Sequence, residues 1–258
     1  MLDLAGVSGA SRTDVFAVGY RNGGSGILHY DGSSWSPMTS GTTSALYGVW
    51  GTSGTDVFVV GDGGTILHSD GTTWTAMTSG TSAYLRGVWG TSPMDVFAVG
   101  ASGTIVHYDG TRWTPMTSGT TQVLRGVWGS SRTDVYAVGD NGTVLHYDGA
   151  TWTATPLEGG TPAVTGAWGA SGAAVFVAIP GWNQVRRFDG STWSTDALGL
   201  SVGWLWGVAA NDVYGLVNDG SIVRYNGTSW SGVVGGLGGD LRGMGGTSDG
   251  DVFVAGIN

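Results

Sequence analysis

Residues 46–79 read LYGVWGTSGTDVFVVGDGGTILHSDGTTWTAMTS and contain the pattern that decides the fold. Turn residues separate four short apolar runs: LYGVWG (46–51), DVFVVG (56–61), GTILHSD (64–70) and TWTAMTS (73–79). Apolar and polar residues alternate within the runs and β-branched side chains are frequent, which is typical of β-strands. The Asp62-Gly63 pair suits a two-residue hairpin with positive φ, so the second and third runs are predicted to pair antiparallel.

The same pattern recurs along the whole chain. The tryptophan of the first run occurs at spacings of 39, 39 and 40 residues, as Trp50, Trp89, Trp128 and Trp168. A DGxxW or NGxxW turn leads into the fourth run, with its tryptophan at Trp35, Trp74, Trp113, Trp152, Trp193 and Trp230. Four antiparallel strands at a period of about 40 residues are the signature of a propeller blade. The predicted fold class is therefore all-β, a β-propeller of four-stranded antiparallel blades.

The number of blades follows from counting half repeats. The first two runs occur as seven pairs but the last two as six, because VFVAGIN (252–258) reaches only the point where a seventh turn begins. We expect one domain, 1–258, with seven blade positions and an incomplete last blade. The repeats span about 1–41, 42–80, 81–119, 120–159, 160–199 and 200–237, with a partial repeat at 238–258. The alternatives are a six-bladed ring that ejects one pair, and a natural chain that continues past Asn258.

An incomplete last blade has a further consequence. It leaves an open strand edge near Val252–Val254, and unpaired backbone groups at such an edge favour self-association between chains.

The composition argues against several classes of partner. The formal net charge is −9, and all 10 basic residues are arginine. Such an acidic surface repels phosphate groups, so neither nucleic acid nor an anionic membrane surface is an expected partner. No stretch approaches the roughly 18 apolar residues needed to cross a bilayer, so no membrane insertion is expected.

The chain has no cysteine, which excludes thiol catalysis, cysteine-ligated zinc and disulfides. Its first residues, MLDLAGVSGASRTD (1–14), lack the basic and apolar segments of a signal peptide. We expect an extracellular or cell-surface location, with the export signal absent from this chain and a cytoplasmic location as the alternative.

Four of the turns carry a family resemblance. HYDGSSW (29–35), HSDGTTW (68–74), HYDGTRW (107–113) and HYDGATW (146–152) resemble the Asp-box, or BNR, repeat of propeller proteins. In that family an Asp-Gly turn joins the two outer strands ahead of a Trp, and its members include sialidases, other glycosidases and several lectins. Here the Asp-to-Trp spacing is one residue shorter, and His or Arg stands two residues before the Asp where the family usually has Ser or Thr. The resemblance implies a propeller of the non-enzymatic, lectin-like branch.

The histidines and aspartates of these turns are interpreted as structural. His68 and Asp70 point to the same side of their strand, where the carboxylate can accept turn amides and the imidazole can bond that carboxylate or nearby backbone. Later repeats replace the histidine by Arg187 and Arg224, an exchange that a hydrogen-bond donor survives and a metal ligand does not. We therefore predict no metal site. Aspartates that begin the second run, such as Asp56, are expected to bond turn amides.

Function is expected where the repetition breaks, and three tryptophans stand out of register: Trp182, Trp204 and Trp206. We interpret AIPGWNQV (178–185) as a lengthened loop of repeat five, and SVGWLWGV (201–208) as the connection into repeat six. These connections emerge on one face of antiparallel blades, so Trp182 and Trp204 are predicted to flank a cleft. The amides of Asn183 and Gln184 lie alongside, and indoles with amides form a platform for a sugar. The alternative is that these tryptophans cover an irregular junction.

A second candidate lies on the same face. The residue before the first-run glycine varies among repeats two to seven: Tyr47, Arg86, Arg125, Thr165, Trp206 and Arg242. The arginines of this set are predicted to form a positive focus at the channel mouth of an acidic molecule. Repeat one adds an enlarged loop with Tyr20, Arg21 and Asn22. The alternative is that the arginines are solvated or paired with aspartates.

Catalysis is not expected. Glycoside hydrolysis usually needs two carboxylates beside the bond, or a Tyr–Glu pair with a separate acid, yet the chain has a single glutamate, Glu158. No nucleophile elbow, zinc-protease or phosphate-loop motif is present, and no cofactor is implied. The leading hypothesis is a non-catalytic, carbohydrate-binding module. The alternatives are a protein-interaction scaffold and, behind it, a sialidase-like glycoside hydrolase.

Overall fold

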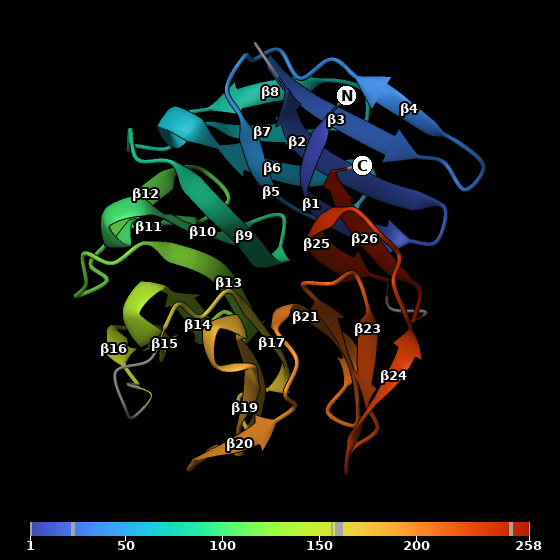
Figure 1. Ribbon diagram of the computed structural model, residues 1–258. Coiled ribbons are helices and arrows are strands. Elements are labelled where there is room, and N and C mark those ends of the chain that lie inside the picture. Colours follow the sequence, from blue (N-terminus) through green and yellow to red (C-terminus); the bar gives the residue numbers. More distant parts are fainter. Residues whose placement is uncertain (1, 22–23, 156, 158–161, 248–249, 258) are drawn as a thin grey trace.

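The strands of this chain form seven antiparallel sheets that are arranged as blades around a central axis (Figure 1). The computed structural model describes residues 2–21, 24–155, 157, 162–247 and 250–257. Six blades have four strands and the seventh has two, which confirms the predicted propeller with an incomplete last blade. In the described part of the chain, no helix has the length and apolar character needed to cross a membrane.

Each complete blade is a meander whose strands follow one another in chain order from the channel to the rim. Blade one contains β1 (Asp3–Ser11), β2 (Asp14–Arg21), β3 (Gly24–Tyr30) and β4 (Trp35–Met38). Blade two contains β5 (Leu46–Ser53), β6 (Asp56–Gly61), β7 (Ile66–Ser69) and β8 (Trp74–Met77). Blade three contains β9 (Leu85–Ser92), β10 (Asp95–Gly100), β11 (Ile105–Tyr108) and β12 (Trp113–Met116). Blade four contains β13 (Leu124–Ser131), β14 (Asp134–Gly139), β15 (Val144–Tyr147) and β16 (Trp152–Ala154).

The remaining blades follow the same order. Blade five contains β17 (Gly166–Ser171), β18 (Ala174–Ile179), β19 (Gln184–Phe188) and β20 (Trp193–Ala197). Blade six contains β21 (Val202–Ala209), β22 (Asp212–Val217), β23 (Ile222–Tyr225) and β24 (Trp230–Val234), and blade seven contains β25 (Asp240–Gly246) and β26 (Val252–Ile257). Short 3₁₀ turns join the second and third strands of blades two to five: η1 (Asp62–Gly64), η2 (Ala101–Gly103), η3 (Asp140–Gly142) and η4 (Pro180–Trp182).

These turns differ from the predicted two-residue hairpin. In blade two the last ladder pair is Val60 with Ile66, so the connection is longer than two residues. The N–H of Thr65 donates to the carbonyl of Asp62 at 3.0 Å and closes the turn. Gly63 has a φ of 63°, in the left-handed region that favours glycine. The prediction was wrong in loop length, whereas the antiparallel pairing and the positive φ are confirmed.

The core lies between the blades, which stack face to face. The second strand of each complete blade is therefore covered on both sides, and Phe58 and Phe97 at its centre in blades two and three are at most 1% exposed. The first-strand tryptophans connect neighbouring blades: Trp128 is 9% exposed, and a Cβ added at Gly169 of the next blade would lie 2.5 Å from its ring. The repeated tryptophans are buried or half-buried core residues, with the exception of Trp35, which is 43% exposed.

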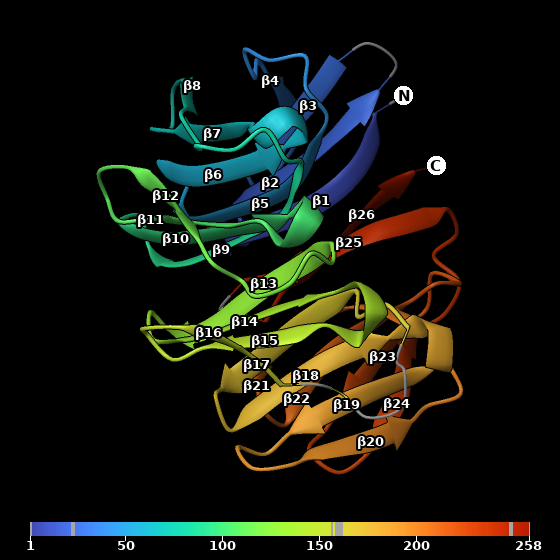
Figure 2. The ribbon, with the colours of Figure 1, turned by 90° about the vertical axis from the view of Figure 1, so that its left-hand side faces the viewer.

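Blades seven and one close the ring. Nη1 of Arg242 donates to the hydroxyl of Tyr20 at 3.0 Å, although 222 residues separate the two in sequence. A Cβ added at Gly243 of β25 would lie 3.1 Å from the carbonyl oxygen of Ala5 in β1, so the two inner strands are in close contact. Both views show β25 and β26 beside β1 (Figures 1 and 2). In the described residues β26 pairs only with β25, and its other edge is open, as predicted.

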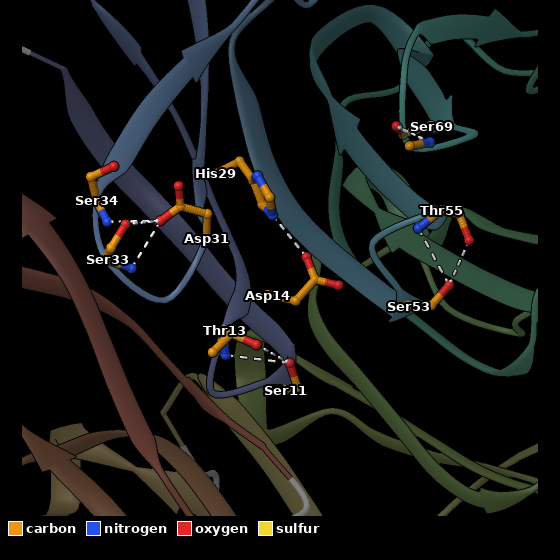
Figure 3. Close-up of polar contacts among 11 residues, drawn as sticks. Ser11, Thr13, Asp14, His29, Asp31, Ser33, Ser34, Ser53, Thr55 and Ser69 are labelled. Carbon is orange, nitrogen blue, oxygen red and sulfur yellow. Dashed lines mark hydrogen bonds and ion pairs between the residues drawn. The ribbon is translucent and has the colours of Figure 1, made fainter.

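A histidine–aspartate pair connects the second and third strands of blades one to four. Nε2 lies 2.7 to 3.0 Å from Oδ1 in the pairs His29–Asp14, His68–Asp56, His107–Asp95 and His146–Asp134. Figure 3 shows the first of these pairs. Two expectations are thereby corrected: the imidazole bonds neither the following turn aspartate nor backbone, and the aspartate that begins the second strand accepts this imidazole. The reason is the antiparallel pairing, which brings the start of one strand beside the end of the next.

The turn aspartates cap their own turns, as predicted. Oδ1 of Asp31 accepts the N–H groups of Ser33 at 2.8 Å and Ser34 at 2.9 Å (Figure 3). The hydrogen bond from the Ser33 hydroxyl, with those from the two amides, lowers the pKa of Asp31 to about 2. The same two amide bonds recur at Asp70, Asp109, Asp148, Asp189 and Asn226.

The last two complete blades show why arginine can replace the histidine. In blade six, Nε of Arg224 donates to Asp212, the aspartate that begins the second strand, at 2.6 Å. Blade five has Ala174 at that position, and Nε of Arg187 lies 3.0 Å from Asp196 instead. The described residues contain no group of three or more His, Asp or Glu side chains that could hold a metal ion. The motif is a hydrogen-bonding element of the fold.

Candidate functional site

The inner strands surround a cavity at one end of the central channel. Its volume is about 580 Å³, and we call it the channel-mouth cavity. Residues from all seven blades line it: Ala5, Tyr20, Tyr47, Arg86, Arg125, Thr165, Trp204, Asn218, Asp240, Leu241 and Arg242. It is the place where one ligand can contact every blade of the ring.

A β-bulge explains why the sequence varies at these positions. In blade two, Leu46 pairs with Gly61 and Gly48 with Val60, so Tyr47 has no partner in the ladder. The same shift leaves one residue unpaired in five further blades: Ala5, Arg86, Arg125, Gly203 and Arg242. A bulge re-aims its extra residue and frees that side chain from ladder packing. The structure therefore places the varied residues other than Trp206 around the channel mouth, where the sequence predicted them.

The register corrects the assignment of Trp206. In β21, Trp206 pairs with Tyr214 as Trp128 pairs with Tyr136 in blade four. A Cβ added at Gly246 of the next blade would lie 2.5 Å from the Trp206 ring. Trp206 is thus an inner-strand core tryptophan in register with the others, and it does not line the channel-mouth cavity.

Trp204 is the tryptophan that reaches the cavity. It was expected in a connecting loop, but it lies within β21 and pairs with Leu216. Its ladder position is glycine in the other blades: Gly6, Gly48, Gly87, Gly126, Gly166 and Gly243. Where the other blades have only the hydrogen atom of a glycine, blade six has the half-buried indole of Trp204, which forms an aromatic wall on one side of the cavity.

Two of the three cavity arginines are held by carboxylates. Nε of Arg125 donates to Oδ1 of Asp140 at 2.5 Å. Nε of Arg242 donates to Oδ2 of Asp240 at 2.9 Å, and this pairing raises the pKa of the guanidinium. The alternative that the channel-mouth arginines pair with aspartates thus holds for these two. The positive potential at the channel mouth is therefore weaker than three unpaired arginines would produce.

Arg86 differs from the other two. Its side chain is exposed, and it forms no ion pair with any described carboxylate. The guanidinium carbon lies 5.6 Å from the ring centroid of Tyr47 and 5.5 Å from that of Tyr84, within cation–π range. Two aromatic rings therefore orient Arg86, while its N–H groups remain available to an anion.

Tyr47 provides a neutral hydroxyl next to this cation. The hydroxyl donates to Oδ1 of Asp62 at 3.0 Å. Burial of the ring and this hydrogen bond raise the pKa of Tyr47 to about 12. Tyr47 stays protonated at neutral pH and acts as a fixed hydrogen-bonding and aromatic group of the cavity wall.

Trp182, Asn183 and Gln184 lie elsewhere. Ile179 pairs with Gln184, so residues 180–183 connect the strands and the loop is not lengthened as predicted. The Ser201 hydroxyl donates to the carbonyl of Pro180 at 3.2 Å, which confirms that the connection into blade six lies beside this loop. The half-buried Trp182 ring is covered by Arg186, whose guanidinium carbon lies 5.7 Å from the ring centroid. Trp182 does not line the cavity that contains Trp204.

Sequence reasoning missed several cavity residues. Asn218 belongs to a turn, where its N–H donates to the carbonyl of Ser201 as that of Asp62 donates to Ala45, and Asp240 begins β25. For Asp240 there was a local signal in the sequence. It stands two residues before Arg242, and opposite charges at that spacing on a strand can form an ion pair. Of the other residues singled out, Asn22 and Glu158 lie outside the described residues, and Arg21 ends β2.

A larger hollow of about 710 Å³ lies at the rim between blades two and three. It is lined mainly by glycine, threonine and serine, together with Ile105, Val106, Pro115 and Met116, and no charged side chain lines it. Because binding sites combine apolar surface with a few placed polar or charged groups, the channel-mouth cavity is the better candidate.

Comparisons with known proteins support the fold. No protein-family model matches this chain, and no curated protein sequence matches it. A solved structure of YCF48 bound to D1 peptide matches with a TM-score of 0.79 and 15% identity, over 99% of this chain and 89% of that one. Virginiamycin B lyase from Staphylococcus aureus matches with a TM-score of 0.82 and 10% identity, over 99% and 92% of the two chains. The WD40 repeats of RRP9 match with a TM-score of 0.81 and 11% identity, over 100% and 88%.

These neighbours are all β-propellers. Their TM-scores show that the architecture is shared, and they include a lyase as well as a protein bound to a peptide; at identities of 10–15% the likeness extends to the fold alone. Membership of the Asp-box family stays a prediction.

Proposed function

We propose that this propeller is a non-catalytic recognition module that binds an acidic peptide segment at the channel-mouth cavity. The observation that carries the proposal is Arg86, the cavity arginine that no described carboxylate neutralises. A guanidinium presents several N–H donors in a fixed plane, which suits a carboxylate in two-point contact. The cavity therefore favours a ligand with at least one carboxylate.

The surroundings of Arg86 favour a peptide as the carrier of that carboxylate. Tyr20, Tyr47 and Trp204 give aromatic surface, and Asn218 and Thr165 add groups that can bond peptide amides. One structural neighbour, YCF48, is described in complex with a peptide, which agrees with this use of the fold.

The cavity is poorly equipped for hydrolysis. Its one lining carboxylate, Asp240, is held by Arg242, and Asp140 and Asp62 beside the wall are engaged by Arg125 and Tyr47. Glycoside hydrolysis usually needs two carboxyl groups that are free to exchange a proton or attack the sugar. We therefore assign a binding role to the cavity.

Carbohydrate is the second candidate, and Trp204 is the observation that favours it. An indole beside Asn218 and Thr165 can stack on a sugar ring while neighbouring polar groups bond its hydroxyls. This reading retains the lectin-like function that the Asp-box resemblance implies, with Trp204 alone in place of a Trp182–Trp204 pair.

Two peptides and one glycan array separate the candidates. An (Ala-Glu)₃ peptide with a free carboxyl terminus is titrated against the chain calorimetrically, with an amidated (Ala-Gln)₃ peptide as the neutral control. We expect saturable binding of the acidic peptide only. Arg86→Gln should weaken it by about tenfold, the magnitude of one charge-assisted contact. Arg112→Gln is the matched control, because Arg112 is an exposed arginine of the same blade and lies in the outer turn.

Equal binding of both peptides, or equal effects of the two arginine substitutions, would contradict the peptide proposal. Binding of neutral glycans on the array, with neither peptide bound, would select the carbohydrate candidate.

A further inference from the structure

A groove of about 480 Å³ lies between the outer strands of blades five and six, and we call it the blade five–six groove. Blade five contributes β20 and the residues that follow it, and blade six contributes β23 and β24. The side chains that matter for a ligand are Thr195, Asp196, Leu200, Tyr225, Trp230 and Ser231. The groove shares no lining residue with the channel-mouth cavity.

Asp196 distinguishes this blade boundary from the earlier ones. In blades one to three, a methionine of the fourth strand pairs with an isoleucine of the third: Met38, Met77 and Met116. Each packs in the same apolar core as the fourth-strand tryptophan of the following blade, and the sulfur of Met77 lies 3.5 Å from Nε1 of Trp113. In blade five, Asp196 pairs with Val185 at this position. A short carboxylate therefore replaces the long thioether side chain.

The charge of Asp196 is compensated by Arg187. Nε of Arg187 lies 3.0 Å from Oδ2 of Asp196, and its Nη2 donates to Oδ1 at 3.3 Å. Arg187 is available for this pairing because blade five has Ala174 where blade six has the aspartate that binds Arg224. Asp196 is the one charged residue in the lining, so the groove contains a neutral ion pair. It gives no advantage to a cationic or an anionic ligand.

Asp196 can still accept a hydrogen bond from a ligand. Its Oδ2 accepts the indole N–H of Trp230 at 2.9 Å in addition to the contact with Arg187. An ionised carboxylate has about four lone-pair sites, so Oδ1 has capacity for a further donor. The Asp196 side chain is 18% exposed and therefore within reach. The hydroxyl groups of Thr195 and Ser231 are exposed residues of the same lining and can both donate and accept.

Trp230 gives the groove an aromatic surface of fixed orientation. Its N–H bond to Asp196 holds the indole, and the Tyr225 ring packs beside it with ring centroids 5.4 Å apart. Trp230 is half-buried, and Leu200 at the edge of the groove is 39% exposed. The hollow between blades two and three has no aromatic residue in its lining. The blade five–six groove therefore combines apolar surface with a few placed polar groups.

From these observations we propose that the blade five–six groove binds a neutral sugar. The indole of Trp230 packs on the C–H face of the sugar ring, and Leu200 covers its edge. Oδ1 of Asp196 and the hydroxyls of Thr195 and Ser231 bond the sugar hydroxyls. A pyranose meets these conditions because it has an apolar ring face, several hydroxyl groups and no charge. The site does not depend on the function proposed for the channel-mouth cavity.

Binding is tested on the full chain by saturation-transfer NMR with the methyl glycosides of glucose, galactose and N-acetylglucosamine at millimolar concentration. We expect saturation transfer to the ring C–H protons of at least one of them, and a saturable titration. The indole N–H resonance of Trp230, identified by its absence in Trp230→Phe, should shift in the same titration.

A double variant fills the groove with residues that the repeat itself uses. Asp196→Met restores the methionine of blades one to three, and Ala174→Asp gives Arg187 the partner that Arg224 has in blade six. The chain should therefore fold, which Tm verifies, and sugar binding should weaken by at least about tenfold, the magnitude of one lost charge-assisted contact. Trp204→Gly is the control, because Trp204 lies in the channel-mouth cavity and its loss should leave this binding unchanged.

Two outcomes would overturn the proposal directly: no saturation transfer to any of the three glycosides, or equal binding by the original chain and the double variant. Loss of sugar binding with Trp204→Gly but not with the double variant would place the sugar at the channel mouth instead. A shift of the Trp230 resonance with tetramethylammonium or acetate, but not with the sugars, would show that the groove selects a charged ligand.

Discussion

Nε2 of His107 lies 2.7 Å from Oδ1 of Asp95, and the imidazole stacks on Phe97 with ring centroids 4.3 Å apart. One side chain thus joins a polar pair to the apolar core of blade three. Because blade six uses Arg224 and Asp212 in the same places, the pair requires a donor of suitable reach and no proton transfer.

Replacing His107 tests that interpretation. His107→Ala should lower the free energy of unfolding by about 1–3 kcal/mol, since it leaves Asp95 without its donor and removes the stacked ring. His107→Arg should lose clearly less. Urea unfolding of the three proteins at pH 7 measures both effects, and an arginine variant as unstable as the alanine variant would contradict a hydrogen-bonding role.

The turn aspartates should matter for stability and not for ligand binding. Asp109 accepts the N–H groups of Thr111 at 2.8 Å and Arg112 at 2.9 Å, in a turn far from the channel mouth. Asp109→Ala should therefore lower Tm, whereas Asp109→Asn should nearly preserve it, because Asn226 caps the equivalent turn of blade six. A loss of ligand affinity at unchanged Tm would show that the turn has a binding role.

Acid should destabilise the same turns. Hydrogen bonds to the folded carboxylate hold the pKa of Asp31 at about 2, below its ordinary value of 3.8. The stability that this carboxylate contributes is present above pH 4 and is lost as the pH falls from about 4 to 2. Unfolding measured between pH 7 and pH 2 should therefore show a smaller decline for Asp31→Asn, whose amide does not titrate. An unchanged pH profile would rule out a contribution from Asp31.

The contact between neighbouring blades should tolerate no added carbon at Gly169. A Cβ there would lie 2.5 Å from the Trp128 ring, closer than side-chain packing allows. Gly169→Ala should cost about 1–3 kcal/mol in unfolding free energy, the usual effect of overpacking. Gly232→Ala is the control, since a Cβ at that strand position meets no atom within 4 Å. Similar Tm values for the two variants would contradict the tight stacking.

The sequence predicts this fold well because the fold repeats. Spacings of 39 and 40 residues between Trp50, Trp89, Trp128 and Trp168 report the blade period directly. Side-chain partners across strands were predicted poorly, since the pairing of His68 with Asp56 depends on which residues face each other in the ladder. Local spacing suggested Asp70 instead.

At the channel mouth, the sequence likewise did not show which residue of a strand a bulge leaves unpaired. Aligning the blades by the nearest glycine placed Trp206 at the channel mouth. The bulge in β21 instead puts Gly203 at the unpaired position and Trp204 beside it. A bulge shifts the register by one residue and leaves no sign in composition or hydropathy. The local sequence also did not show that Arg125 is paired, because its partner Asp140 lies in a turn 15 residues away.

Trp204 and Trp182 should now behave differently, and this is the sharpest test of the site. Trp204 lines the channel-mouth cavity, while Trp182 is covered by Arg186 and does not line it. Trp204→Gly restores the residue that the other six blades have at this position, so the backbone accommodates it and Tm should fall less than with Trp128→Ala. Binding of the (Ala-Glu)₃ peptide, or of a glycan selected on the array, should weaken by about 2 kcal/mol if the indole forms a binding wall. Trp182→Ala should leave the affinity unchanged. Calorimetric titration of both variants measures the difference, and a loss of affinity with Trp182→Ala but not with Trp204→Gly would move the binding site to the turn of blade five.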